Sequence, residues 1–113
     1  MSDCLFCKII AGEIPSAKVY ENDQVYAFRD IHPMAPTHVL VVPKTHVASL
    51  AEVGAVSDEL LAACLRACSA VADQEGLTGG FRVASNCGPD ACQSVQHLHF
   101  HVLGGQKLTE VMG

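Results

Sequence analysis

Three histidines occupy every second position near the C-terminal end of the chain, at His97, His99 and His101, with Leu98, Phe100 and Val102 between and after them. In a strand, successive side chains point to opposite faces, so the histidines share one face and the apolar residues share the other. Neighbours on such a face lie roughly 6.5 to 7 Å apart, close enough for two imidazoles to contact adjacent atoms of one small ligand. This favours a catalytic or binding strand over a solvated strand face that happens to carry histidine.

Cys4 and Cys7 form a C-x-x-C pair near the N-terminus. The spacing suits two thiolates on one Zn²⁺, and redox pairs or two packed thiols use it as well. A redox motif is expected near a β-α-β pattern, whereas this pair precedes any predicted strand. A metal here would need two more ligands from elsewhere in the fold, and His46 and His97 are the candidates.

Length and composition favour one domain, residues 1–113, because 113 residues of which 50% are hydrophobic suit a single core. A net charge of −5 without any Lys/Arg cluster argues against a nucleic-acid partner. No apolar run reaches the length of a membrane span, and the N-terminus lacks the features of a secretory signal. We therefore expect a cytoplasmic protein without a membrane partner, in which the six cysteines stay reduced.

The pattern along the chain alternates between strands and helices. Ser57 and the two acidic residues after it mark the start of a long helix. The predicted order is a short helix over 4–11, strands over 18–21, 24–28 and 38–43, the long helix over 57–74, a strand over 81–85, a loop over 86–94 and the histidine strand. These elements predict an α+β fold with an antiparallel sheet of about five strands, a short N-terminal helix and one long helix.

The chain resembles the histidine triad (HIT) family, and more closely its Hint branch of nucleoside phosphoramidases. The motif of that family is H-φ-H-φ-H-φ-φ, with φ apolar, and residues 97–103 fit every position. Further similar segments follow in the same order along the chain, at 28–31, 35–38, 42–46, 93–95 and 104–105. The resemblance implies a HIT-like fold and a homodimer.

The resemblance also implies a reaction. His99 would attack the α-phosphorus of a purine nucleoside phosphoramidate, or of an acyl- or aminoacyl-nucleotide, and water would then hydrolyse the nucleotidyl-histidine to release the nucleoside monophosphate. A neutral imidazole is a competent nucleophile near pH 7. His101 would contact the phosphate, His38 would assist proton relay, Ser94 would help deliver a proton to the departing amine, and His97 would orient the strand face or ligate zinc.

A purine nucleotide ligand of AMP or GMP type is the implied partner. Asp30 would accept hydrogen bonds from the ribose hydroxyls, Gln93 and Ser94 would aim donors at the phosphate, and Asn86 would contact the sugar or the phosphate. The base would lie against apolar side chains, for which the candidates are Phe6, Ile9, Phe28, Ile31 and Leu40.

By the same resemblance, a structural Zn²⁺ would be held by Cys4, Cys7, His46 and His97. Four protein ligands close the coordination sphere and leave no position for activating water, so no catalytic metal is expected. Packed thiols without metal remain the alternative for the cysteine pair.

Three other functions fit the same residues. A sister branch of the family would use the triad as a dinucleoside polyphosphate hydrolase or nucleotidyltransferase. A metalloenzyme would use His97, His99 and His101 as ligands of a catalytic ion, and a nucleotide-binding interaction module would use no catalysis at all. Cys87, Pro89 and Cys92 in the loop before the triad depart from the usual Hint pattern, and the tail after Gly105 lacks the aromatic residue that some Hint proteins carry.

Overall fold

The structure is a computed structural model that describes residues 3–112. The elements, in chain order, are α1 (Leu5–Ile10), β1 (Lys18–Glu21), β2 (Val25–Arg29), β3 (Thr37–Pro43), the 3₁₀ helix η1 (Leu50–Ala55), α2 (Asp58–Gln74), β4 (Phe81–Ala84), the 3₁₀ helix η2 (Pro89–Ala91) and β5 (Phe100–Gly104). This confirms the predicted α+β fold with one short and one long helix. The two 3₁₀ helices are additions that the sequence pattern did not indicate.

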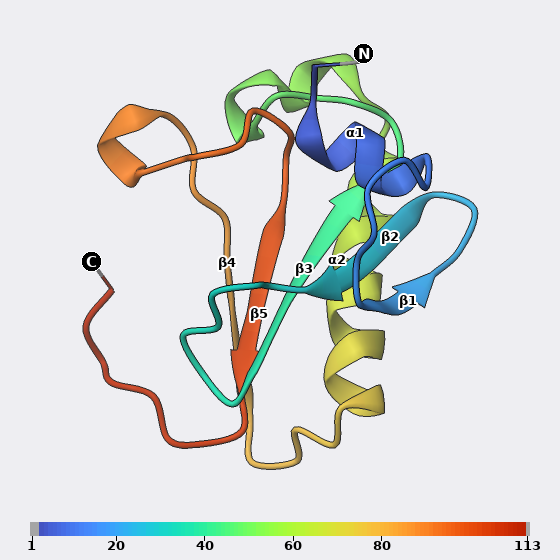
Figure 1. The fold of residues 1–113 in the computed structure, drawn as a ribbon. Helices are drawn as coiled ribbons and strands as arrows, with labels where there is room; N and C mark the ends of the chain where they lie inside the picture. The colour runs from blue at the N-terminus through green and yellow to red at the C-terminus, as the bar shows by residue number, and fades with distance from the viewer. Residues whose placement is uncertain (1–2, 113) are drawn as a thin grey trace.

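All strand pairs are antiparallel, and the five-stranded sheet has the order β1-β2-β3-β5-β4. β3 and β5 are therefore neighbours near the middle of the sheet, although 56 residues lie between the end of β3 at Pro43 and the start of β5 at Phe100. In their register Leu40 lies opposite His101 and His38 lies opposite Leu103. Figure 1 shows α2 along one side of the sheet and α1 near the ends of β2 and β3.

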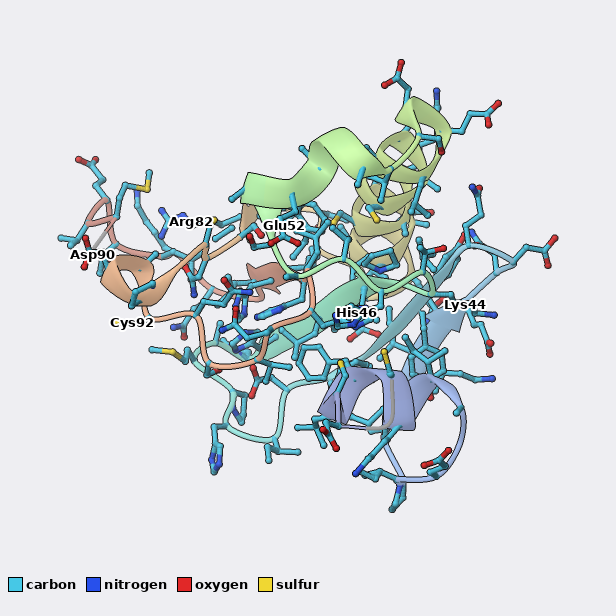
Figure 2. All side chains as sticks on the ribbon, turned by 90° about the horizontal axis from the view of Figure 1, so that it is seen from above. Lys44, His46, Glu52, Arg82, Asp90 and Cys92 are labelled. Atoms are coloured by element: carbon cyan, nitrogen blue, oxygen red, sulfur yellow. The ribbon has the colours of Figure 1, made fainter. Side chains whose placement is uncertain are left out.

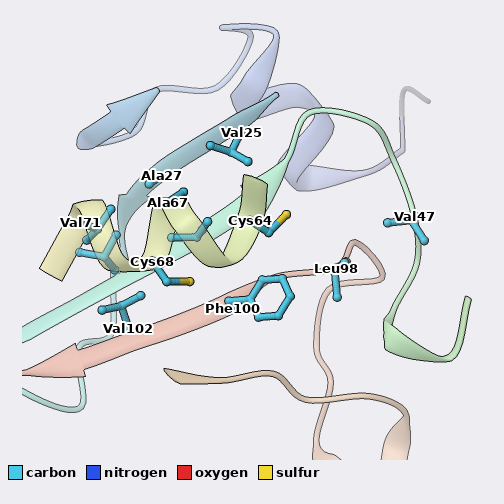
Figure 3. Close-up of a cluster of buried hydrophobic side chains, with 12 residues drawn as sticks. Val25, Ala27, Val47, Cys64, Ala67, Cys68, Val71, Leu98, Phe100 and Val102 are labelled. Carbon is cyan, nitrogen blue, oxygen red and sulfur yellow. The ribbon is translucent and has the colours of Figure 1, made fainter. Parts of the chain in front are cut away.

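The main core lies between the sheet and α2. Leu98, Phe100 and Val102 pack there with a row of buried residues on α2, which includes Cys64 and Cys68 (Figure 3). Burial raises the pKa of the Cys64 thiol to about 11 and that of Cys68 to about 12. Both therefore stay protonated and act as small apolar side chains of the core.

A second apolar cluster covers the opposite face of the sheet. Phe6 and Ile9 from α1 pack against Phe28 of β2 and against Leu40 and Val42 of β3. The alternation of the histidine segment thus separates two layers, with the apolar residues turned to α2 and the histidines turned to α1. Phe6 meets the His99 ring edge-on, with 5.1 Å between the ring centroids.

One boundary differs from the prediction, because β5 begins at Phe100 and not at His97. The last pair of the β3–β5 ladder is Val41 with Phe100. Beyond it, Pro43 has no N–H to donate, and its carbonyl accepts a hydrogen bond from the ring of His97. The Leu98 N–H donates to the Val47 carbonyl at 2.7 Å in place of a ladder partner. His97 and His99 therefore lie on an irregular extended segment that leads into the strand.

No helix within residues 3–112 has both the length and the apolar character needed to cross a membrane.

Candidate active site

The His99 ring is held in one tautomer by its main-chain neighbour. Its Nδ1 lies 2.7 Å from the carbonyl oxygen of His97, and a carbonyl can only accept a hydrogen bond. Nδ1 therefore carries the proton, and the neutral ring keeps its lone pair at Nε2. Among the described residues only His101 Nε2 is both sealed from solvent and without a partner. The His99 Nε2 also makes no hydrogen bond, but it is not sealed from solvent, so an incoming ligand can reach it.

A chain of hydrogen bonds fixes the tautomers of His38 and His101 in the same way. The Met34 N–H donates to His38 Nδ1 at 3.0 Å, so the proton of a neutral His38 is at Nε2. His38 Nε2 lies 2.8 Å from His101 Nδ1, which must then accept and leave the His101 proton at Nε2. The His99 and His101 rings are 5.1 Å apart. A lone pair on one ring therefore lies beside an unpartnered N–H donor on the next.

Burial keeps these imidazoles neutral. Burial, with smaller contributions from the neighbouring His99 and His38 rings, lowers the pKa of His101 to about 4, although Asp30 opposes the shift. Burial also lowers the pKa of His38, which Asp30 partly offsets from a carboxylate oxygen 3.4 Å from His38 Nε2. Neutral rings are the condition under which the chain of tautomers holds at pH 7.

Four of the five apolar residues predicted to hold a base pack together, and one of them, Phe6, contacts the His99 ring. Phe6, Ile9, Phe28 and Leu40 form a single buried wall. Ile31 is not part of it, because its side chain is 86% exposed on the loop between β2 and β3. Asp30 lies at the start of that loop, where one oxygen accepts from the His32 N–H at 2.8 Å. A bound base is the kind of apolar surface that Ile31 could cover.

Ser94 lies in the loop between β4 and β5, three residues before His97, and its side chain is exposed and makes no hydrogen bond within residues 3–112. Asn86 lies half-buried at the other end of this loop. Ser94 also borders a cavity of about 670 Å³ whose lining includes Cys4, His46 and Val95. The cavity is open to solvent and lies on the side of the metal-ligand candidates, away from the wall at Phe28 and Leu40.

The hydrogen-bond donors of Gln93, which were predicted to contact a phosphate, are bonded to main-chain carbonyls of the protein. Both N–H bonds of its side-chain amide go to main-chain carbonyls, one on Ala48 at 2.8 Å and one on Val95 at 3.0 Å. The main-chain N–H of Gln93 donates to the Gly88 carbonyl at 3.1 Å. No donor of Gln93 is left for a phosphate oxygen in this conformation, so the predicted contact would require Gln93 to give up one of these partners.

The structure brings the four predicted metal ligands together. The candidate ligand atoms of Cys4, Cys7, His46 and His97 all lie within 4.8 Å of one another. The Cys4 Sγ lies 3.3 Å from the His97 Nδ1, the Cys7 Sγ lies 3.3 Å from the His46 Nδ1, and the two Nδ1 atoms are 3.2 Å apart. Figure 2 shows the sulfur atoms of the α1 segment directed toward His46.

These distances and the protonation of His97 fit a tetrahedral zinc site. Zn–S bonds of about 2.3 Å and Zn–N bonds of about 2.0 to 2.1 Å in a tetrahedron separate S from N by about 3.6 Å and N from N by about 3.3 Å. His97 Nε2 donates to the Pro43 carbonyl at 2.9 Å, so its Nδ1 lone pair faces the two sulfurs. His97 is fully buried, and burial lowers the pKa of its ring, which favours the neutral form that binds metal.

The triad itself does not form a metal site. Among residues 3–112 the only other convergent group of potential ligands is Asp30, His38 and His101. His38 Nε2 and His101 Nε2 carry protons in the chain described above, and His101 Nδ1 already accepts from His38. No free imidazole lone pair remains there, and the alternative in which His97, His99 and His101 share a catalytic ion has no convergent donor set.

Two contacts that support the site were not predicted. The Ser85 hydroxyl donates to the main-chain oxygen of His99 at 2.8 Å, which ties the backbone of His99 to the end of β4. Phe6 contacts the rings of both His97 and His99 from one side chain. Neither contact has a local signal in the sequence, because each joins segments that are brought together only by the sheet.

Comparison with known proteins agrees with this arrangement. A family profile described as "HIT domain" matches residues 11–108. A "14 kDa zinc-binding protein" of Zea mays is 49% identical over 109 residues, which cover 95% of this chain and 85% of that protein. A "purine nucleoside phosphoramidase" of Escherichia coli K12 is 40% identical over 107 residues, which cover 94% and 90%. The crystal structure of a HIT family hydrolase from Legionella pneumophila superposes with a TM-score of 0.94 at 45% identity, covering 97% of this chain and 99% of that one.

The neutral His101 makes stability depend on pH. Its folded pKa is lowered to about 4 from the ordinary value of 6.5, so between these two pH values the unfolded chain binds a proton that the folded protein does not. The free energy of unfolding should therefore fall as the pH is lowered through this window. His101→Asn should reduce the fall between pH 6.5 and 5 by about 1 kcal/mol, measured by urea titration at each pH.

His32→Asn is the matched control, because the His32 side chain is exposed. It should keep the wild-type dependence. Equal slopes for wild type and His101→Asn would contradict the assignment of a neutral, half-buried His101.

Proposed function

The chain belongs to the HIT domain family, and from this premise we propose that it is a nucleotide hydrolase acting through a nucleotidyl-histidine intermediate on His99. Its substrates would be purine nucleoside phosphoramidates or acyl- and aminoacyl-nucleotides, cleaved at the bond to the α-phosphate. One observation carries the proposal: the hydrogen bond from His99 Nδ1 to the His97 carbonyl leaves an unblocked lone pair at His99 Nε2. The similarity to the purine nucleoside phosphoramidase of E. coli supports the substrate class.

In the first step the His99 Nε2 lone pair forms a bond to the α-phosphorus, and the bond from phosphorus to the leaving nitrogen or oxygen breaks. The leaving group takes a proton, which solvent supplies and which the exposed Ser94 hydroxyl would relay. The ring becomes cationic while it carries the nucleotidyl group, and the His97 carbonyl at Nδ1 stabilises that charge.

In the second step water attacks phosphorus and gives up a proton to solvent. The bond to His99 Nε2 breaks with its electron pair returning to the ring, and the nucleoside monophosphate leaves with the ring again neutral. Both steps concentrate negative charge on the phosphate oxygens. The unpartnered His101 Nε2–H is a donor fixed in place for that charge. His38, bonded to His101, keeps the donor tautomer and can exchange its proton with Asp30 at the site's edge.

The nucleoside would lie against the wall of the second apolar cluster. Phe6 borders His99 directly, and Phe28 and Leu40 extend the apolar surface away from it. The Asp30 carboxylate lies at the rim, next to His38, where it can accept from both ribose hydroxyls. A flat apolar wall followed by a carboxylate acceptor suits a purine nucleoside.

Covalent trapping tests the proposal. Rapid quenching after mixing with an adenosine phosphoramidate should give a protein heavier by one adenylyl group, and peptide mapping should place it on His99. His99→Asn should give no adduct and lose at least about 10⁴-fold in kcat. His32→Asn, which changes an exposed histidine, should behave as wild type. Full turnover by His99→Asn, or an adduct at another residue, would refute the assignment of the nucleophile.

We also propose that Cys4, Cys7, His46 and His97 hold a structural Zn²⁺. The convergence of their ligand atoms and the similarity to the zinc-binding protein of Zea mays support this. Zinc would join the start of α1, the segment after β3 and the segment before β5 through closed coordination, without taking part in turnover. All six cysteines are free thiols, which suits the reducing cytoplasm where we place the protein.

Elemental analysis after metal-replete expression should give about one zinc per chain. Cys7→Ser should lose the metal and lower the midpoint of thermal unfolding, because a structural zinc contributes directly to folding. Cys92→Ser, which changes an exposed thiol, should keep both. A wild-type protein without zinc and with the stability of Cys7→Ser would exclude the site.

We propose that the protein is a homodimer that pairs through β4. This strand is an edge of the sheet, and Phe81 and Val83 on it are 45% and 38% exposed. Val83 lies opposite Val102, so both apolar residues face the α2 side, where Leu65 is 57% exposed. An unpaired edge beside an apolar surface fits a second copy related by a two-fold axis.

Sedimentation equilibrium should give the mass of a dimer. Leu65→Lys and Val83→Lys should shift the mass toward the monomer because each places a charge in the apolar contact, whereas Val111→Lys, in the exposed tail, should not. A wild-type monomer at micromolar concentration would contradict this arrangement.

A further inference from the structure

The side chain of Gln93 joins three main-chain segments. Its Oε1 accepts from the Gly88 N–H at 2.9 Å, and its Nε2 donates to the carbonyls of Ala48 and Val95 at 2.8 and 3.0 Å. Because two of these partners are carbonyls and one is an N–H, a single orientation of the amide satisfies all three. Ala48 is 45 residues away in sequence, just after the metal-ligand candidate His46.

These bonds enclose Ser94 from both sides. On the N-terminal side, the Gln93 N–H is tied to the Gly88 carbonyl. On the C-terminal side, the Val95 carbonyl is tied to the Gln93 amide. Farther along, the Leu98 N–H donates to the Val47 carbonyl, so the segment from 93 to 98 is attached at both ends to residues 47–48. Ser94 itself has an exposed side chain, and its position follows from those attachments.

The backbone just before Gln93 is strained. Cys92 has φ 61°, and it is the only non-glycine residue with positive φ in the part of the chain that the structure describes. Such a conformation is disfavoured for a residue with a Cβ and persists where its surroundings determine it. The N–H groups of Cys92 and Gln93 are bound to the carbonyls of Pro89 and Gly88, which hold the chain in this turn.

We propose that Gln93 is a positioning residue that acts through Ser94, and that it makes no contact with the substrate. Its amide fixes the loop so that the Ser94 hydroxyl stays on the leaving-group side of the phosphate. The inference rests on the proposed function, and it replaces the direct phosphate contact that the sequence suggested for Gln93. It predicts that loss of the amide matters only while Ser94 is present.

A double-mutant cycle separates this role from direct binding. Gln93→Met keeps the side-chain length but removes the donors and the acceptor, and it should lower kcat for an adenosine phosphoramidate by about tenfold, as expected for a misplaced group. In a Ser94→Ala background the same change should cost less than about twofold. KM and the Kd for AMP should change by less than about twofold in either background, because the amide does not touch the nucleotide.

Gln93→Glu is the second variant, since it keeps the acceptor for Gly88 but turns an oxygen toward the carbonyls of Ala48 and Val95. It should lower kcat at least as much as Gln93→Met. Gln106→Met, on an exposed segment, is the matched control and should change neither kcat nor the Kd for AMP. An equal loss from Gln93→Met in both backgrounds, or an AMP Kd raised tenfold or more, would overturn the inference.

Backbone ¹⁵N relaxation gives a readout that does not depend on turnover. In Gln93→Met the order parameters of Ser94 and Val95 should fall from about 0.85 to below about 0.6, while Gln106→Met should leave them unchanged. Unchanged order parameters in Gln93→Met would overturn the inference even if kcat fell. Absence of an adduct on wild-type His99 would refute the proposed function alone, and the relaxation comparison would still decide the role of Gln93.

Discussion

A neutral imidazole has one lone pair, and the hydrogen bond from His99 Nδ1 to the His97 carbonyl decides that this lone pair is at Nε2. The rest of the site depends on that bond. His97 shows the opposite arrangement, because its Nε2 donates to the Pro43 carbonyl and its Nδ1 lone pair faces Cys4 and Cys7. Two histidines separated by one residue thus present different nitrogens to different partners. One suits attack on phosphorus, and the other suits a metal.

The sheet creates this arrangement because β5 begins only at Phe100. At Pro43 the main chain of β3 cannot donate, so the segment before β5 turns its carbonyls and N–H groups to other partners. The His97 carbonyl is then free to accept from His99. The alternation of side chains persists through this segment, which keeps Leu98 in the core with α2 while His97 and His99 meet Phe6 on the other face.

Layering also sets the electrostatics. His101 lies on β5, opposite Leu40 of β3. Burial is the main cause that lowers its pKa to about 4, and within the described residues His38 supplies the only hydrogen bond to its ring. A ring that stays neutral and has a proton at Nε2 can donate to a phosphate oxygen without first losing a charge. The acid that would raise these pKa values, Asp30, lies at the rim and is half-buried.

Features that depend on local pattern could be predicted from the sequence. The alternation at His97 to Val102, the helix cap at Ser57, whose hydroxyl accepts from the Leu60 N–H at 3.1 Å, and the strands that flank them follow from side-chain period and capping. The C-x-x-C spacing made His46 and His97 candidates for the remaining metal ligands, and the family resemblance implied the same set of four.

Features that depend on partners far away in the chain could not be predicted. The start of β5 depends on Pro43, the hydrogen bonds of Gln93 depend on Ala48, and the exposure of Ile31 depends on how its loop leaves β2. The amide of Gln93 is chemically suited both to a phosphate and to a main-chain carbonyl, and only the tertiary structure shows which one it meets.

The tautomer of His99 tests the central claim most directly. Long-range ¹H–¹⁵N correlation spectra of the protein at pH 7, with His99 identified by its loss in His99→Asn, report which ring nitrogen carries the proton. The account predicts a proton at Nδ1 and an unprotonated, metal-free Nε2. A proton at Nε2, or a metal bound there, would contradict it.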